Sequence, residues 1–107
     1  MQIASFVLPY TDTRGPRYEP AHQEARCRLL NTFGGFTTSE VKGAWLDTSN
    51  DPPVTYYDNS IRYEIASEWT IDLLHKFRDI IQDTGQIANQ KCVYAVYDGI
   101  AEILEII

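Results

Sequence analysis

The feature that most constrains how this chain folds is a strand followed at once by an amphipathic helix, within residues 60–85. Ile61, Tyr63 and Ile65 alternate with two charged residues, which predicts a strand with one buried face. Further on, apolar residues recur at three- and four-residue spacing, which predicts a helix with one buried stripe. The residues of that stripe are Ile71, Leu73, Leu74, Phe77, Ile80 and Ile81. Because such a helix must cover a sheet, the rest of the chain has to supply more strands and a second helix.

The ends of this helix are also marked in the sequence. We expect Ser67 to cap its N-terminus, because a hydroxyl oxygen can accept a hydrogen bond from the free amides of the first turn. We expect Gly85 to end it, because glycine adopts the left-handed conformation that terminates many helices.

The first part of the chain supplies an interior strand and the second helix. Residues 3–9 form a nearly continuous apolar run, which is typical of a strand buried on both faces, in the interior of the sheet. Residues 10–18 are polar and contain turn-forming residues, which indicates a long loop. Pro20 suits the first turn of a helix, and Gly34 suits its end.

The remaining β-prone segments are residues 41–48, 54–57, 91–97 and 100–106. We expect a turn at Asp58-Asn59, before the strand of residues 61–65, and a hairpin at Asp98-Gly99. The order of elements predicts a single α+β domain over residues 1–107 with a ferredoxin-like two-layer sandwich. In that fold an antiparallel sheet carries two helices on one face, and here it gains an extra C-terminal strand.

Composition narrows the function classes. The net charge of -6, concentrated in the second half of the chain, argues against binding to nucleic acid or to an anionic membrane. No apolar run is long enough to span a bilayer, and no basic segment precedes the apolar run near the N-terminus as in a signal peptide. We therefore expect a cytoplasmic protein. Cys27 and Cys92 match no metal or redox spacing, so we expect buried thiols.

One local pattern supports a resemblance. Phe33-Gly34-Gly35-Phe36-Thr37 forms a helix stop followed by an apolar residue and a threonine, and Gly43-Ala44-Trp45 follows within a predicted strand. In this element the chain resembles small uncharacterised bacterial and phage proteins with a ferredoxin-like fold. The resemblance covers about two thirds of the chain in outline. It implies the fold and carries no activity.

The best candidate binding site is the long first loop with the start of the first helix. Tyr10, Arg14, Arg17 and His22 lie there, and arginines near a helix N-terminus can hold a small anionic ligand. The alternative interpretation is a solvated polar loop with surface ion pairs. We expect no metal, because the acidic loop around Asp47 fits no known calcium-binding spacing, and we expect no cofactor, because the chain has no phosphate-binding glycine loop.

Aromatic residues suggest self-association. Trp45, Tyr63, Tyr94 and Tyr97, with the C-terminal isoleucines, make the sheet face opposite the helices more apolar than a small exposed face usually is. A homodimer would cover part of that face. Stacking of nucleic-acid bases on these rings is the less favoured interpretation, because few basic residues accompany them.

These observations favour a small non-enzymatic binding or interaction module, of the kind that phages and mobile elements carry, acting through a protein partner or a small anionic ligand. One alternative is a small dimeric ferredoxin-like enzyme that uses His22 as acid or base. Another is an acidic inhibitor that occupies a basic partner through Glu64, Asp72, Asp79 and Asp83.

Overall fold

The structure of this protein is a computed structural model. It describes residues 1–12, 15–16 and 18–107, with the backbone alone at residues 11, 12, 15, 16 and 45. The elements, in chain order, are β1 (Gln2–Asp12), β2 (Gly15–Pro16), α1 (Glu19–Phe33), β3 (Thr37–Asp47), β4 (Val54–Ser67), α2 (Ile71–Ile87), β5 (Cys92–Tyr97) and β6 (Ile100–Glu105).

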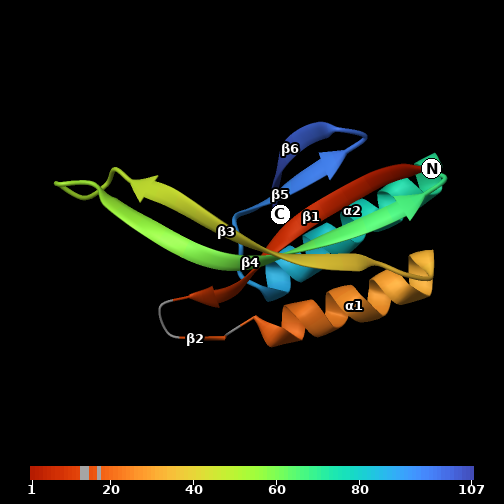
Figure 1. The fold of residues 1–107 in the computed structure, drawn as a ribbon, viewed down its shortest axis with the longest axis horizontal. Coiled ribbons are helices and arrows are strands. Elements are labelled where there is room, and N and C mark those ends of the chain that lie inside the picture. The colour runs from red at the N-terminus through yellow and green to blue at the C-terminus, as the bar shows by residue number, and fades with distance from the viewer. Residues whose placement is uncertain (13–14, 17) are drawn as a thin grey trace.

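The strands form one antiparallel sheet in the order β3-β4-β1-β5-β6, with β2 paired to the end of β1. Both helices lie on the same face of this sheet and pack against each other (Figure 1). This arrangement confirms the predicted ferredoxin-like sandwich with an extra C-terminal strand. The apolar strand β1 lies in the interior of the sheet between β4 and β5, as its sequence predicts.

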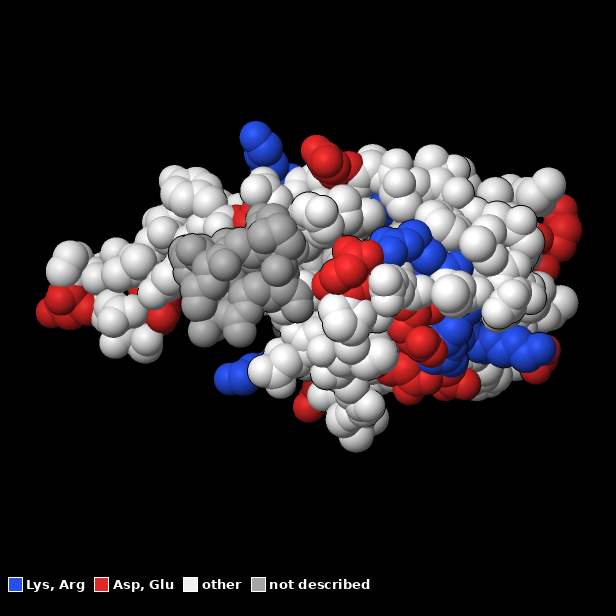
Figure 2. All heavy atoms as spheres, turned by 90° about the horizontal axis from the view of Figure 1, so that it is seen from below, with Lys and Arg blue, Asp and Glu red and all other residues white. Residues whose placement is uncertain are grey.

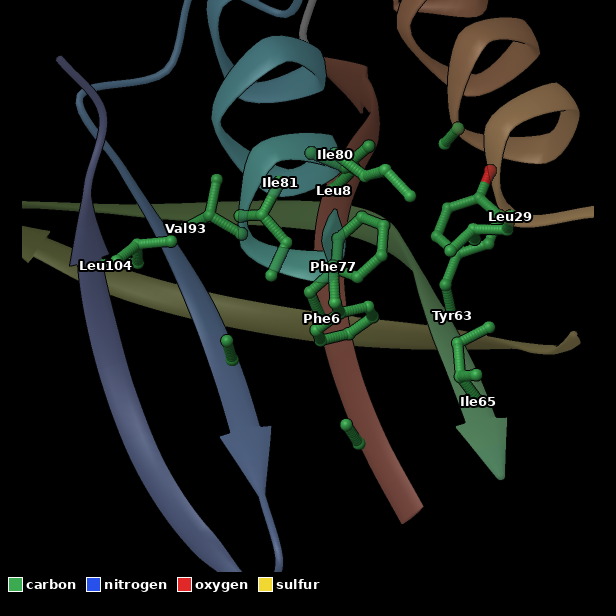
Figure 3. Packing of buried hydrophobic residues seen from close by; sticks show 13 residues of the cluster. Phe6, Leu8, Leu29, Tyr63, Ile65, Phe77, Ile80, Ile81, Val93 and Leu104 are labelled. Carbon is green, nitrogen blue, oxygen red and sulfur yellow. The ribbon is translucent and has the colours of Figure 1, made fainter. Parts of the chain in front are cut away.

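The core lies between the sheet and the helices. The strand register sets Phe6 of β1 opposite Tyr63 of β4 on one side and Ala95 of β5 on the other, so their side chains share one face. Leu29 of α1 and Phe77 of α2 are completely buried and point toward this face (Figure 3). Each helix thus buries its apolar stripe on the three central strands.

The predicted turn at Asp58-Asn59 is wrong, because β4 continues through these residues as one strand. Asp58 pairs with Gly43 of β3, and a Cβ atom at Gly43 would lie only 2.7 Å from the Asp58 Oδ1 atom. The absence of a side chain at Gly43 therefore makes room for the Asp58 carboxylate. Continuous pairing with β3, over all eleven residues Thr37–Asp47, outweighs the local turn preference.

Both predicted ends of α2 differ from the observed ones. Ser67 belongs to β4, and the Thr70 hydroxyl oxygen caps the helix by accepting a hydrogen bond from the Leu73 amide. Gly85 lies inside α2, which ends at Ile87. The side chain of Ile106 packs over Gly85, where an added Cβ would lie 2.7 Å from the Ile106 Cδ1 atom. The close packing of Ile106 explains the glycine at position 85, which does not terminate the helix.

Other local predictions are confirmed. Gly34 ends α1 in the left-handed conformation, with φ of 81°. Asp98 and Gly99 both have positive φ and join β5 to β6 in a hairpin. The polar stretch after Tyr10 is less irregular than expected, because β1 extends to Asp12 and pairs with β2.

Two predictions about burial are wrong. Cys27 and Cys92 are both free and exposed, because they lie on element faces turned away from the core. Tyr63 and Tyr97 point into the core and not onto the open sheet face; each contacts a core phenylalanine ring. The open face therefore carries fewer aromatic rings than the sequence suggests.

Among the described residues, no helix is long and apolar enough to cross a membrane.

The capping of α2 gives the first testable prediction. Thr70→Ala should lower the free energy of unfolding by about 1 kcal/mol, because the Leu73 amide loses its partner. Ser67→Ala is the matched control and should leave stability within about 0.5 kcal/mol of wild type. Urea unfolding followed by circular dichroism measures both. A larger loss in Ser67→Ala than in Thr70→Ala would contradict the observed cap.

Candidate functional site

The first turn of α1 brings a histidine under the end of the sheet. The Tyr18 carbonyl accepts hydrogen bonds from the amides of Ala21 and His22 in this first turn. His22 contacts Pro9 of β1 and Tyr63 of β4, so the turn lies close to both strands. The His22 side chain is only 1% exposed. Its Nε2 atom lies 2.8 Å from the Pro9 carbonyl oxygen, and its Nδ1 atom lies 2.6 Å from the Tyr63 hydroxyl.

These two contacts fix the tautomer of His22 in its neutral form. The Pro9 carbonyl can only accept, so Nε2 carries the hydrogen and donates it. Nδ1 is then the acceptor, and the Tyr63 hydroxyl donates to it. Burial lowers the pKa of His22 below its usual value and raises the pKa of Tyr63 above its usual value. The pair is therefore neutral at physiological pH.

A cleft of about 260 Å³ opens beside this pair. Its walls come from the end of β1, the first turns of α1, the segment around the start of β3, and β4. The lining residues are Tyr10, His22, Arg26, Phe36, Thr38, Glu40, Ile61 and Tyr63. The Tyr10 ring meets the His22 ring edge-on, with 5.7 Å between the ring centroids. The cleft thus combines aromatic rings, a buried hydrogen-bonded pair and charged groups of both signs.

The charges of the cleft lie at its rim. The Arg26 guanidinium donates to the Glu19 carboxylate over 2.6 Å, and it lies close enough to Tyr63 to offset part of the rise in that tyrosine's pKa. Glu40 is exposed and forms no ion pair with the part of the chain that the structure describes. Acidic and basic side chains are interspersed over the surface that carries α1 (Figure 2).

A second hollow of about 230 Å³ adjoins the cleft. It shares Tyr10, Glu40 and Ile61 with the cleft, and it adds Lys42 and Asn59 from the neighbouring parts of β3 and β4. Glu40 therefore stands between the two hollows, with Arg26 on one side and Lys42 on the other. A ligand longer than one ring system could occupy both hollows.

The structure brings together half of the binding residues proposed from sequence. Tyr10 and His22 are in contact in the cleft. Arg14 and Arg17 lie outside the described residues. His75, the other histidine, is exposed on α2, away from the cleft.

Sequence reasoning missed six of the eight lining residues, including Arg26, Glu40 and Tyr63. Arg26 lies one helical turn after His22, a spacing that places both on one helix face. Tyr63 and Glu40 come from strands whose proximity to α1 depends on the order of strands in the sheet. The alternation of Ile61, Tyr63 and Ile65 could have assigned Tyr63 to the helix-facing side.

Metal binding finds no support at this site. Among residues 1–12, 15–16 and 18–107, no group of three or more His, Cys, Asp or Glu side chains is placed to hold a metal ion. The loop after β3 is a turn stabilised by its own side chains: Asp47 accepts hydrogen bonds from the Ser49 amide and hydroxyl and from Asn50.

Comparison with known proteins identifies relatives of the fold. No protein-family model matches the chain, and no curated protein sequence matches it. A solved structure described as a phage SAM lyase in the apo state superposes with a TM-score of 0.62 at 14% identity, over 94% of this chain and 82% of that one. A phage SAM lyase in complex with S-methyl-5'-thioadenosine superposes with a TM-score of 0.61 at 13% identity, over 96% and 88% of the two chains. At such identities the likeness establishes the fold.

The neutral state of His22 predicts how stability depends on pH. The unfolded chain binds a proton at His22 near pH 6.5, whereas the folded chain resists this protonation. The contribution is complete above pH 6.5 and is lost as the pH falls from there toward the lower folded pKa. The loss amounts to at most about 1.4 kcal/mol per pH unit. Urea midpoints between pH 7.5 and pH 5 measure it.

Two variants isolate this effect. His22→Gln should be less stable at neutral pH and should lose this part of the pH dependence. His75→Gln removes an exposed histidine on α2 and should keep the wild-type dependence. Equal pH profiles for wild type and His22→Gln would show that His22 is not held neutral by the fold.

Proposed function

We propose that this protein is a small enzyme that binds its substrate in the cleft beside His22 and Tyr63. We further propose that a sulfonium nucleoside such as S-adenosylmethionine is the substrate class. The observation that carries the proposal is an open cleft, with a buried neutral His–Tyr pair in its wall, on a fold like that of two phage SAM lyase structures. The enzyme alternative is thereby better supported than a non-enzymatic module.

The side chains of the cleft suit the parts of such a substrate. Tyr10 and Phe36 offer aromatic faces, which can stack on an adenine ring or contact a positively charged sulfur. Glu40, without an ion-pair partner among the described residues, can attract the sulfonium or the ammonium group. Arg26 and Lys42 can bind the carboxylate of the amino-acid portion.

The proposed reaction needs no acid catalyst for its leaving group. In the proposed reaction a carboxylate oxygen of the substrate attacks the carbon next to sulfur and forms the C–O bond of a lactone while the sulfur–carbon bond breaks. The electron pair of the broken bond stays on sulfur, which leaves as a neutral thioether and needs no proton. The protein has to hold the substrate in the reactive conformation and keep water from the carbon. Adjoining hollows that hold two ends of a flexible substrate would serve this purpose.

The neutral His–Tyr pair fits a positioning role. Both ring nitrogens of His22 are engaged, so the histidine acts on a ligand through the Tyr63 hydroxyl. The Tyr63 hydroxyl oxygen has two lone pairs, and besides the nearby Arg26 guanidinium it can accept a hydrogen bond from a ribose hydroxyl or an ammonium group. Proton transfer from Tyr63 to His22 would create a buried charge pair, which burial disfavours.

The other functional interpretations remain distinguishable. A cytoplasmic binding module that holds an anion through Arg14 and Arg17 predicts a retained ligand without turnover. An acidic inhibitor predicts salt-dependent capture of a basic protein. The anion-binding interpretation shares Tyr10 and His22 with the cleft but does not involve Glu40, and the inhibitor interpretation uses none of the cleft residues. A Glu40 variant therefore separates both from the enzyme.

We expect the purified protein to release S-methyl-5'-thioadenosine from S-adenosylmethionine, measured by liquid chromatography with mass detection. Glu40→Gln should lower kcat/KM about tenfold or more, because a charge-assisted contact contributes about 1.5–3 kcal/mol. Glu64→Gln is the matched control, because this glutamate lies on β4 on the sheet face opposite the cleft. It should retain the wild-type rate.

Absence of turnover, together with absence of binding in isothermal titration with S-adenosylmethionine, would contradict the substrate class. Binding without turnover would contradict the lyase reaction and would leave a ligand-binding module. Equal losses in Glu40→Gln and Glu64→Gln would place the activity outside the cleft.

A further inference from the structure

The outer half of the β3–β4 hairpin projects beyond the body of the protein. We call residues 43–57 the arm. The molecule measures 47 × 26 × 25 Å along its principal axes, and the arm forms one end of the long axis, beyond the ends of both helices (Figure 1). The arm is fully paired as a two-stranded ribbon from Gly43↔Asp58 to Asp47↔Val54. Its shape is therefore well defined although no helix covers it.

One face of the arm carries exposed apolar side chains. The register pairs Ala44 with Tyr57 and Leu46 with Thr55, and strand alternation puts these four side chains on the face that α1 and α2 cover further along the sheet. Leu46 is 55% exposed and Tyr57 is 79% exposed. The arm thus continues the core-facing side of the sheet into solvent.

The charges at the two ends of this face are complementary. Lys42 lies at the base of the arm, is exposed, and forms no ion pair with the described residues. Asp51 lies in the turn at the tip and is also exposed and without an ion pair among them. When one arm lies antiparallel on another, the base of each meets the tip of the other. Lys42 of each copy then approaches Asp51 of the other.

We propose that the arms of two copies of this chain pack face to face about a two-fold axis. The apolar centre of each arm, around Leu46 and Tyr57, is buried on its counterpart, and Lys42–Asp51 ion pairs close both ends. A two-fold contact requires a self-complementary surface, and a patch with an apolar centre and opposite charges at its two ends has that property. The proposal does not rest on the proposed catalytic function, although Lys42 also lines the second hollow.

The size of the contact sets its strength. A ribbon of five residue pairs is roughly 17 Å long, at about 3.3 Å per residue, and two strands are about 10 Å wide with their side chains. A contact area of this length and width is smaller than the roughly 800 Å² per partner of a standard stable interface. We therefore expect a reversible, concentration-dependent dimer with a dissociation constant in the micromolar range or weaker.

Sedimentation velocity over a concentration series tests the proposal with the whole chain. Wild type should shift from monomer to dimer as the concentration rises. Leu46→Lys and Tyr57→Lys should each weaken association about tenfold or more, because each puts a charge into the centre of the contact. Ile103→Lys is the matched control: Ile103 is 65% exposed on the open face of the sheet, and this variant should dimerise as wild type does.

Charge reversal gives a second, independent readout. Lys42→Glu and Asp51→Lys should each weaken the dimer, and the double variant should regain association because the pairs re-form with opposite signs. All of these positions are exposed, so thermal melting should be unchanged. A monomer at every concentration overturns the proposal. So does a trimer, a dimer lost in Ile103→Lys but not in Leu46→Lys, or a double variant no tighter than the single ones.

Discussion

The structure depends on the way Tyr63 is held between the sheet and the helices. Its ring stacks on Phe6 with centroids 5.3 Å apart, and the Phe6 ring in turn meets Phe77 of α2 edge-on. Its hydroxyl reaches past the apolar core and donates to His22 of α1. One side chain thus joins the two central strands to both helices. Because a buried hydroxyl and a buried imidazole each need a partner, this bond holds the first turn of α1 against β4.

The same interaction gives the cleft its character. Burial keeps His22 and Tyr63 neutral, so they form a hydrogen-bonding wall and leave charge to the rim, where Arg26 and Glu40 lie. A buried neutral pair with charged side chains at the rim suits recognition of a polar substrate better than proton transfer. The fold shared with phage SAM lyases and this arrangement together support the proposed enzyme. Neither the fold nor the cleft alone would do so, since one fold hosts many functions.

The projecting end of the β3–β4 hairpin bears on self-association and not on the cleft. The helices cover only the part of the sheet where the apolar stripes of α1 and α2 lie, and the β3–β4 hairpin extends beyond them (Figure 1). Gly43 lets the Asp58 carboxylate lie against β3 at the point where the arm begins, so the two strands stay paired along the full projection. Among the described residues no helix covers the apolar face of this ribbon, which is the basis for the proposed self-association.

Local sequence determined much of this protein. Apolar alternation and helical spacing predicted both helices, the interior position of β1 and the ferredoxin-like order, because burial of an apolar face follows directly from residue periodicity. Gly34 and Asp98-Gly99 were predicted because positive φ is a local requirement. Only tertiary structure decided the unbroken course of β4, the role of Gly85 and the cap at Thr70. It also decided the site, because Tyr63, Glu40 and His22 meet only when β3, β4 and α1 pack together, and contacts between distant segments leave no mark in local sequence.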